Sequence, residues 1–221
     1  MIAITERMMV SEINPKQTHE FILNLHYAQR LPSISYAFGL FDRGELIAVL
    51  TIGKPASNSL CFGVCGEEHS RQVYELNRLI CLPDLPKNSM SFFVGKCLKM
   101  LSDTDLILIS YADEGAGHHG YVYQATNWWY TGKTKSRTDK YTPAGKHSRH
   151  YNDENNHLRK LRSSKYRYVY IPNKRLRKQI KRIIKYPILD YYPKGDNEKY
   201  TLGERIKQGV LNRQTGEVYY E

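Results

Sequence analysis

The chain has 221 residues, of which 41% are hydrophobic and 25% are charged. This composition is typical of a globular protein with one large or two small domains, and it excludes a collagen, a low-complexity chain and a wholly disordered chain. The longest apolar runs, residues 46–52 and 106–109, are much shorter than the ~18 residues of a membrane span. The first residues also lack a basic and then apolar signal pattern, so we expect a cytoplasmic protein with no membrane partner and with reduced, mostly buried cysteines.

The formal net charge is +11, and it is concentrated in one region. From Lys133 to Lys185 there are 18 Lys or Arg residues and three acids, a net charge of +15, which leaves −4 for the rest of the chain. A segment this positive repels itself, and that cost predicts a polyanionic partner rather than only a solvated surface. Nucleic acid is the partner we expect, with an anionic membrane or non-specific binding as the alternatives.

The first third of the chain predicts mostly strands. Alternating and apolar patterns predict, in chain order, a strand at 2–13, a helix at 17–25, and strands at 35–41, 45–52 and 73–82. Asp42-Arg43-Gly44 predicts a hairpin turn between the second and third of these strands.

The rest of the chain alternates helices and strands. It predicts a helix at 90–101 with Ser89 as its N-cap, a buried strand at 105–111, a helix at 118–125, strands at 128–133 and 165–171, and a helix at 174–185 capped by Asn173. Residues 134–164 read as a long polar loop, and the tail after Pro187 has no assignment. This order predicts an α/β fold, a mixed central sheet with helices on both faces and a basic C-terminal extension.

Four short motifs in a fixed order resemble the phage Mom-type proteins, whose core is similar to the GNAT acyltransferase fold. They are His26-Tyr27, Glu75-Leu76-Asn77-Arg78-Leu79, Ser110-Tyr111-Ala112-Asp113, and Gly117-His118-His119-Gly120-Tyr121 with Asn127-Trp128. The resemblance covers about residues 20–135, so we expect a GNAT-like catalytic core at 1–135. A basic part of the same domain would follow at 136–186, and a polar Tyr-rich tail at 187–221.

The resemblance implies a transferase that adds a small amide-bearing, carbamoylmethyl-type group to the N6 amine of adenine in double-stranded DNA. Such an adduct shields phage DNA from host restriction enzymes, and a phage protein of this kind would work in the host cytoplasm. Two alternatives remain: an acyltransferase of the same fold that acts on RNA or protein, and a non-catalytic DNA-binding protein on a transferase scaffold.

Asp113 follows a buried strand at the sheet edge where ligands bind in open α/β folds, so we expect it to act as the general base. The alternative is a loop acid or a cap of the next helix. Arg78 interrupts an apolar strand, which is costly unless it is paired or faces a cleft. It either bonds Glu75 or Asp113, or clamps an anionic donor or a DNA phosphate. Tyr27 and Ser110 would shape the same pocket.

His26, Tyr27 and Asp113 together offer an imidazole, a phenol and a carboxylate, a set that can bind iron or another divalent metal. A histidine that merely interacts with a helix end is the alternative.

The resemblance also implies an acyl donor. A coenzyme A thioester is one candidate, but residues 85–90 lack the glycines of the GNAT donor loop, so another acyl or aminoacyl donor, small or carrier-bound, stays open. A helix start can hold an anion. We assign donor binding to Lys87, Asn88, Ser89 and Asn127.

The basic segment is expected to contact DNA phosphates. The residues assigned to DNA are Lys133, Lys135, Arg137, Arg159, Arg162, Lys174, Arg175, Lys178 and Lys181. Among Trp128, Trp129 and Tyr130 at least one side chain should face each side of the sheet, and an exposed one could stack on a base swung out of the helix. Core packing is the alternative for these rings.

Overall fold

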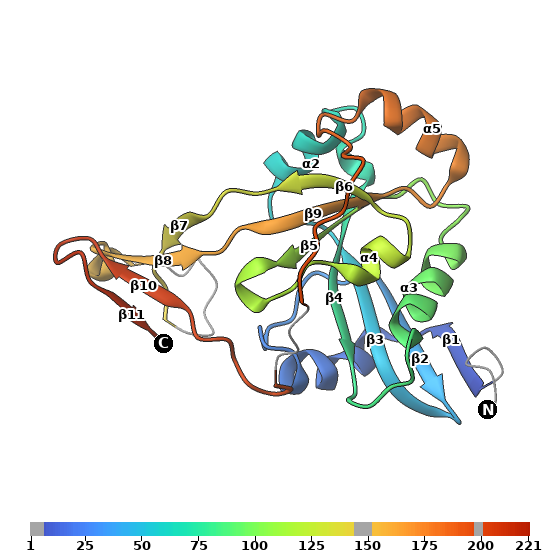
Figure 1. Cartoon of the computed structure of the whole chain (residues 1–221), viewed down its shortest axis with the longest axis horizontal. Helices are drawn as coiled ribbons and strands as arrows, with labels where there is room; N and C mark the ends of the chain where they lie inside the picture. The colour runs from blue at the N-terminus through green and yellow to red at the C-terminus, as the bar shows by residue number, and fades with distance from the viewer. Residues whose placement is uncertain (1–6, 144–151, 197–200) are drawn as a thin grey trace.

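The structure, a computed structural model, describes residues 7–143, 152–196 and 201–221 (Figure 1). Its strands form two sheets, a seven-stranded sheet in the order β1-β2-β3-β4-β5-β9-β6 and a four-stranded sheet in the order β11-β10-β8-β7. The large sheet consists of β1 (Met8–Glu12), β2 (Tyr36–Asp42), β3 (Glu45–Gly53), β4 (Val73–Cys81), β5 (Ile107–Asp113), β9 (Lys165–Tyr170) and β6 (Trp129–Lys133). The small sheet consists of β7 (Arg137–Lys140), β8 (Leu158–Arg162), β10 (Gly209–Asn212) and β11 (Val218–Tyr220).

Helices and helical turns connect the strands. The α-helices are α2 (Asn58–Cys65), α3 (Ser89–Met100), α4 (Tyr121–Ala125) and α5 (Lys174–Ile183). The shorter turns are η1 (Pro15–Thr18), the π-helical η2 (Phe21–Leu25), η3 (Ser70–Gln72), η4 (Glu114–Ala116) and η6 (Asp153–Asn155). Among the described residues, no helix is long and apolar enough to span a bilayer.

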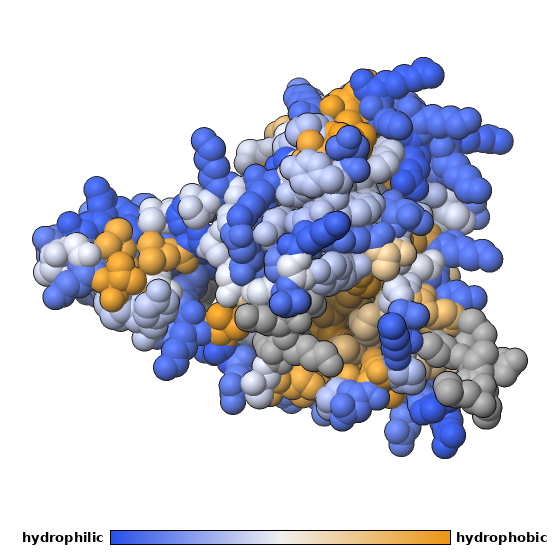
Figure 2. All heavy atoms as spheres, viewed as in Figure 1, coloured by the Kyte–Doolittle hydropathy of each residue, from blue (hydrophilic) through white to orange (hydrophobic). Residues whose placement is uncertain are grey.

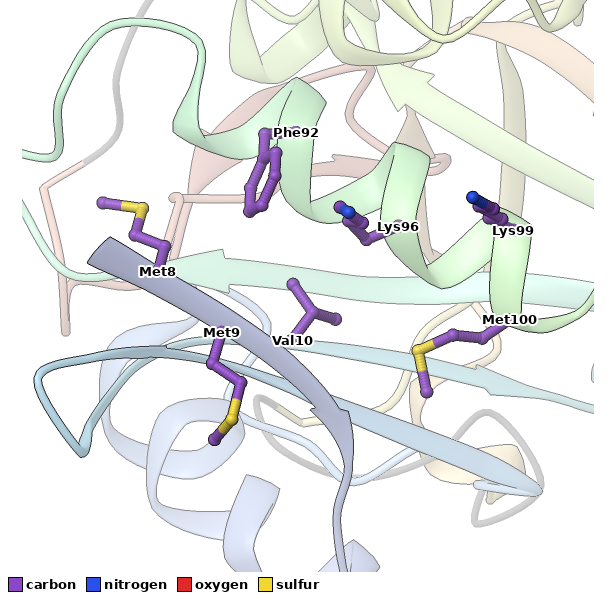
Figure 3. Close-up of a pocket in the computed structure, with 7 residues that line it drawn as sticks. All are labelled: Met8, Met9, Val10, Phe92, Lys96, Lys99 and Met100. Atoms are coloured by element: carbon purple, nitrogen blue, oxygen red, sulfur yellow. The ribbon is translucent and has the colours of Figure 1, made fainter. Parts of the chain in front are cut away.

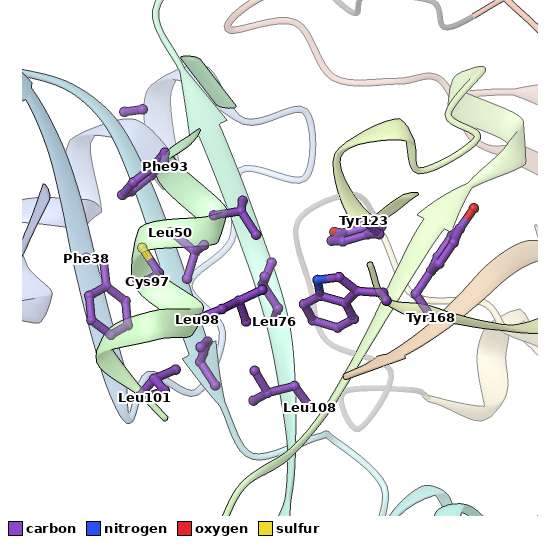
Figure 4. Close-up of a cluster of buried hydrophobic side chains, with 14 of the residues drawn as sticks. Phe38, Leu50, Leu76, Phe93, Cys97, Leu98, Leu101, Leu108, Tyr123 and Tyr168 are labelled. Atoms are coloured by element: carbon purple, nitrogen blue, oxygen red, sulfur yellow. The ribbon is translucent and has the colours of Figure 1, made fainter. Parts of the chain in front are cut away.

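Helices cover both faces of the large sheet, as the sequence predicted. On one face, α3 and α4 pack on a core that includes Leu76 and Leu108, and Figure 4 shows the α3 side chains Phe93 and Leu98 within this cluster. On the other face, α2 and α5 pack against Ile107 and Ile109, while η2 covers the neighbouring strands. Successive residues of β5 therefore serve opposite cores, because side chains alternate along a strand.

The hairpin between β2 and β3 is confirmed. Asp42 pairs with Glu45, and the two turn residues Arg43 and Gly44 have φ values of 51° and 89°. Positive φ at both central positions is the geometry of a two-residue hairpin turn whose twist matches that of the strands. Asn173 is also confirmed as the cap of α5, because its side chain accepts from Arg175 N at 2.9 Å.

Several expectations for single elements are wrong. The N-cap of α3 is Asn88, in a left-handed conformation and without a side-chain hydrogen bond; Ser89 is the first helical residue, and its Oγ donates to Pro86 O at 2.6 Å. The helix expected at 17–25 is instead divided between η1 and η2. The sequence analysis also missed α2, which Ser57 caps.

The largest difference lies in the segment read as a polar loop and in the unassigned tail. The loop contains β7 and β8, and the tail contributes β10, which pairs with β8 through Val210 and Lys160. Strand β8 has the sequence Leu-Arg-Lys-Leu-Arg, whose charges mask the alternation of its buried residues. Its stability as a strand comes from partners about 20 residues before it and 50 after it, which a local pattern does not reveal.

Candidate functional site

Two neighbouring strands of the large sheet separate and leave a fork between them. Strands β4 and β5 run parallel and pair only from Val73 to Glu75 on β4. Beyond Glu75, β4 remains paired with β3, whereas β5 pairs with β9 as far as Asp113. Ser110 on β5 spans the start of the fork, because its Oγ donates to Leu76 O at 2.9 Å. Arg78 and Asp113 thus lie on the two arms of one opening.

Asp113 is the last residue of β5 rather than a loop residue after it. Its Oδ2 lies 2.6 Å from Lys165 Nζ, and its Oδ1 accepts hydrogen bonds from Gly115 N at 3.0 Å and from the Ser163 hydroxyl. Burial raises the pKa of this carboxyl, but the charge and hydrogen bond of Lys165, with those of Ser163 and Gly115, hold the pKa below its ordinary value. Asp113 is therefore an anion at neutral pH, and it also caps η4, which was the alternative reading of the sequence.

Arg78 and its neighbour Asn77 hold the loop that follows η2. The Arg78 guanidinium donates to Asn77 O at 2.6 Å and to Arg30 O at 2.9 Å. The Asn77 side chain donates to Ser33 O at 2.9 Å and accepts from the Thr51 hydroxyl at 2.6 Å. These bonds fix the loop containing Tyr27 over the fork, so the Asn-Arg pair positions this loop and at the same time places a cation in the site.

His26 and Tyr27 lie near the Arg78 guanidinium at the same opening. Their rings stack with centroids 4.2 Å apart, His26 Nδ1 accepts from Ala28 N at 2.9 Å, and the Tyr27 ring lies edge-on to the His118 ring at 6.3 Å. Burial, together with the positive charges of Arg78 and His118, lowers the pKa of His26 to about 3. Burial and the charge of Asp113 raise the pKa of Tyr27 to about 12, although Arg78 opposes this. The structure therefore brings His26, Tyr27, Arg78 and Asp113 together, as the sequence predicted.

The buried state of His26 makes the stability of the protein depend on pH. The folded protein keeps His26 neutral, whereas the unfolded chain takes up a proton near pH 6.5. The free energy of unfolding should therefore be at its full value above pH 6.5 and fall by about 1.4 kcal/mol for each pH unit below it, down to the folded pKa.

Denaturant unfolding at pH 7 and pH 5 measures this loss, and we expect His26 to account for about 2 kcal/mol of it. His26→Asn keeps an acceptor for Ala28 N but removes the titrating ring, so its unfolding free energy should differ less between the two pH values. An equal difference in both proteins would contradict the prediction.

Beneath the fork lies a pair of buried hydroxyls. Ser110 Oγ and Tyr123 Oη are 2.7 Å apart, and both residues are buried. Burial raises the pKa of Tyr123 to about 12. Ser110 was predicted as a site residue from the sequence, but Tyr123 was not. Tyr123 lies two residues after Tyr121, next to the Gly117–Tyr121 motif of the resemblance, and this closeness could have indicated it.

Glu75 is a second carboxyl at the base of the fork, and the sequence analysis treated it only as a partner for Arg78. Burial raises the pKa of Glu75, while the charges of Arg78 and Lys165 lower it. Its charge in turn contributes to raising the pKa of Tyr111 and Tyr123, which places it in the field of the same site. Lys165 was also missed, because it is 52 residues from Asp113 in the sequence.

Two of the groups in the expected metal set bind other partners within the protein. His26 Nδ1 accepts from Ala28 N, and Asp113 binds the ammonium of Lys165, a cation in the place that a metal would take. In the part of the chain that the structure describes, no group of three or more His, Cys, Asp or Glu side chains could hold a metal ion. The described residues therefore give no support to the metal expected at His26, Tyr27 and Asp113.

The comparison with protein families supplies the identification. The family model of the Mom protein family matches residues 7–194, which is most of the chain. The chain belongs to the Mom protein family. Methylcarbamoylase mom of Escherichia phage Mu is 30% identical to it over 136 residues, which make up 60% of this chain and 56% of that protein. The match thus spans little more than half the length of this relative.

Solved structures similar to this Mom-family protein are acetyltransferases. A GNAT-family acetyltransferase from Bacillus anthracis has a TM-score of 0.45 and 13% identity, covering 75% of this chain and 95% of that one. A proposed acetyltransferase from Salmonella typhimurium, solved with its cofactor acetyl-CoA, has a TM-score of 0.48 and 6% identity, covering 76% and 95%. Because both TM-scores are below 0.5, these structures add nothing about the fold beyond the strand order of the large sheet.

The residues assigned to the donor lie on two separate elements of the Mom-family protein. Lys87 and Asn88 are exposed at the start of α3, whereas Ser89 is buried and its hydroxyl donates a hydrogen bond to Pro86 O. Asn127 is exposed after α4, and its carbonyl accepts from Arg177 of α5 at 3.1 Å. The structure therefore leaves Lys87 and Asn88 as the exposed groups at the helix start.

The three aromatic residues at β6 divide between the two cores, as expected. Trp128 and Tyr130 are buried on the α3 and α4 face. Trp129 faces the other side, where the Arg177 guanidinium lies 5.1 Å from its ring. Trp129 is thus the one ring of the three that is not fully enclosed, and a cation already covers it.

The basic residues assigned to DNA form two groups. The first group lies at the Asp113 end of β5, on β6 and the small sheet, and consists of Lys133, Lys135, Arg137, Arg159 and Arg162. In this group Lys133 pairs with Glu114. The Asp139 carboxylate lies 3.2 Å from Arg137 Nε and 2.8 Å from Arg162 Nε. The α5 residues follow β9 at the opposite end of β5. Six residue steps separate the two ends, roughly 20 Å along a strand.

A pocket of about 520 Å³ lies away from this site, between the edge strand β1 and α3 (Figure 3). Methionines 8, 9 and 100, with Val10 and Phe92, form its apolar lining, and two lysines of α3 border it. Because four strand positions separate β1 from β5, this pocket takes no part in the chemistry of the fork.

Proposed function

We propose that this chain is a transferase that attaches a small amide-bearing, carbamoylmethyl-type group to the N6 amine of adenine in double-stranded DNA. One observation carries the proposal: the fork between β4 and β5 holds an ionised carboxylate, Asp113, at the point where a strongly basic sheet begins. Membership of the Mom protein family supports it, and so does the similarity to a protein named methylcarbamoylase.

We assign the proton transfer to Asp113. The reaction forms a bond from N6 to a carbon of the donor, releases the leaving group with its electron pair, and removes one proton from N6. An anionic carboxylate at the fork can accept that proton, and Lys165 keeps it ionised beforehand. We assign proton donation to the leaving group to the Ser110–Tyr123 hydroxyl pair, and the raised pKa of Tyr123 keeps its proton in place at neutral pH.

Arg78, Tyr27 and His26 form the opposite wall of the site in this proposal. The guanidinium offers a cation to a donor anion or a DNA phosphate, and Tyr27 and His26 offer a stacked ring pair to a planar base. The adenine must leave the helix to reach the fork, because its N6 is otherwise paired and stacked. The finished adduct would then project into the major groove and alter the donor and acceptor pattern that restriction enzymes read.

The donor is an acyl or aminoacyl compound in this proposal, and a coenzyme A thioester is one candidate. Attack of N6 on the acyl carbon would give an N6-acyl adenine, so a carbamoylmethyl product requires attack on a methylene carbon of the donor that itself carries the leaving group. The exposed start of α3 with Lys87 and Asn88 is the surface we assign to an anionic part of the donor.

Mass spectrometry of nucleosides tests the function directly. DNA from cells that express the protein should contain a new adenine species that control cells lack. If the new species is found only in RNA or protein, the chain is an acyltransferase for another substrate; if none is found while duplex DNA is bound, it is a non-catalytic DNA-binding protein.

The basic face of α5 gives a separate prediction for DNA binding. Changing Lys174, Arg175, Lys178 and Lys181 to Gln should weaken binding equally across DNA sequences, and each lost phosphate contact should reduce the slope of log affinity against log salt by ~0.9. The helix should survive, because Leu176 and Ile180 are buried and the four changed positions are exposed. An unchanged salt slope would exclude α5 from the interface, and reduced binding to anionic vesicles alone would indicate a membrane partner.

A further inference from the structure

The small sheet begins at the catalytic fork and extends away from the large sheet as an arm (Figure 1). Strand β8 ends at Arg162, and the next residue, Ser163, donates its hydroxyl hydrogen bond to Asp113. Strand β9 starts two residues later at Lys165, the partner of Asp113. A molecule bound along β8 would therefore lead directly to the proposed base.

The two faces of this sheet differ in burial. Asp139, Lys160, Val210 and Tyr219 form one row across the four strands, and Lys160 and Val210 are buried with exposures of 7% and 0%. The adjacent row, Lys140, Arg159, Leu211 and Val218, points to the opposite side because side chains alternate along each strand. No member of this second row is buried, and Val218 is 47% exposed.

We call this second side the open face; besides that row it carries Thr138, Leu161 and Tyr220, and Tyr220 is 68% exposed. The face is divided by strand: β7 and β8 contribute the basic side chains, whereas β10 and β11 contribute apolar and aromatic ones. Figure 2 shows apolar surface on this arm bordered by hydrophilic side chains. A solvent-exposed sheet face would not need side chains such as Leu211, Val218 and Tyr220 in one place.

The charges of the open face favour an anion. Lys140 and Arg159 are direct cross-strand neighbours, so this face carries two basic side chains next to each other. On the other face the pair Arg137 and Arg162 has Asp139 between them, whereas the strand residues of the open face include no acid. A polyanion laid along β7 and β8 would contact both of these basic side chains.

We propose that the open face docks the DNA duplex beside the target adenine, with Lys140 and Arg159 on phosphates and Leu211, Val218 and Tyr220 on sugars and base edges. This inference rests on the proposed function and adds the surface that holds the flanking DNA. Four strands ~4.8 Å apart span ~14 Å, slightly more than the ~12 Å major groove. The basic strands can thus lie on one phosphate ridge while the apolar strands lie over the groove.

The distances along β8 agree with a flanking site. Arg159 is four residues before Ser163, about 13 Å along an extended strand, which corresponds to about four base pairs at ~3.4 Å each. The open face would therefore contact base pairs beyond the target, and its apolar side chains would make transfer depend on the flanking sequence.

Fluorescence anisotropy with a duplex of about 20 base pairs, measured over a range of salt concentrations, separates the two kinds of contact. Lys140→Gln with Arg159→Gln should lower the slope of log affinity against log salt by up to about 1.8, two contacts at ~0.9 each. Leu211→Thr with Val218→Thr keeps strand-forming side chains and should weaken binding roughly tenfold at every salt concentration, with the slope unchanged. The control is Lys96→Gln with Lys99→Gln, which removes the same charge from exposed positions of α3 and should keep the wild-type slope and affinity.

Three outcomes overturn the proposal. If both arm variants bind duplex DNA as the wild type does, the open face does not hold DNA, while the proposed function stands. If the wild type itself binds no duplex, both fail. If the Leu211 and Val218 changes alter only the sedimentation of the protein, the face is an interface between copies of this chain. Should thermal melting show that this double variant is unfolded, Tyr220→Ser replaces it, with the same expected loss at constant slope.

Discussion

Replacing Asp113 by Asn should reduce transfer by about 10²- to 10⁴-fold, the usual contribution of a general base. Asn has nearly the same shape, and its side-chain oxygen can still accept from Gly115 N and from the Ser163 hydroxyl. What it lacks is the negative charge that would accept a proton from N6 in the proposed reaction. The amount of modified adenine in DNA from expressing cells measures the loss, with duplex binding measured in parallel and expected to change little.

Asp42→Asn is the matched control for this variant. Asp42 is also a carboxylate at the end of a strand and in an ion pair, with Arg7, but it lies on β2 at the far side of the sheet. The same chemical change there should leave transfer at the wild-type level. If Asp113→Asn modifies DNA as fast as the control does, Asp113 is not the base, and Glu75→Gln becomes the variant to compare.

Lys165→Met tests the same assignment through pH. Without the ammonium, burial is opposed only by the hydrogen bonds from Ser163 and Gly115, so the pKa of Asp113 rises and the carboxylate becomes protonated at a higher pH than in the wild type. The acidic limb of the pH–rate profile should therefore move to higher pH, while the rate on the alkaline side of that limb is retained. A uniform loss of rate at all pH values would show that Lys165 acts in another way.

The local parts of the site could be predicted from the sequence, because short motifs carry them. Asp113 at the end of a buried strand and Arg78 within an apolar one are each recognisable from their neighbours alone. The fork that separates them could not be predicted, because it depends on the parting of β4 and β5 after only three paired residues. No pattern within either strand indicates where its partner leaves it.

Non-local pairing also explains the errors in the basic segment. The strands predicted at 128–133 and 165–171 do pair with each other, as β6 and β9. In addition, β9 pairs with β5 and so lies between β5 and β6 in the sheet. This insertion brings Lys165 opposite Asp113. Strands β7 and β8 went unrecognised because their residues are mostly charged, and because β8 pairs on its other side with β10, about 50 residues later in the sequence. The charged residues predicted a loop here, and this prediction is wrong because β7 and β8 lie in this segment.

Arg78→Lys should lower transfer at least about tenfold in a protein that still folds. Lysine keeps the positive charge but not the planar fork, so it cannot donate to Asn77 O and Arg30 O together. One lost hydrogen bond costs only about 0.5–1.5 kcal/mol of folding stability, which the large sheet can absorb. The loop with His26 and Tyr27 should loosen instead, and hydrogen exchange of residues 26–33 measures this directly.

Two further variants separate the charge of Arg78 from its hold on the loop. Asn77→Ala removes the bond to Ser33 O but keeps the guanidinium, so a similar loss of transfer in this variant would assign Arg78 mainly to positioning the loop. Arg78→Gln removes the charge as well; if it transfers much more slowly than Arg78→Lys, the cation also acts on a donor anion or a phosphate. Full transfer by Arg78→Lys with faster exchange in the loop would contradict both roles, because it would mean that neither the fork of the guanidinium nor the rigidity of the loop limits the reaction.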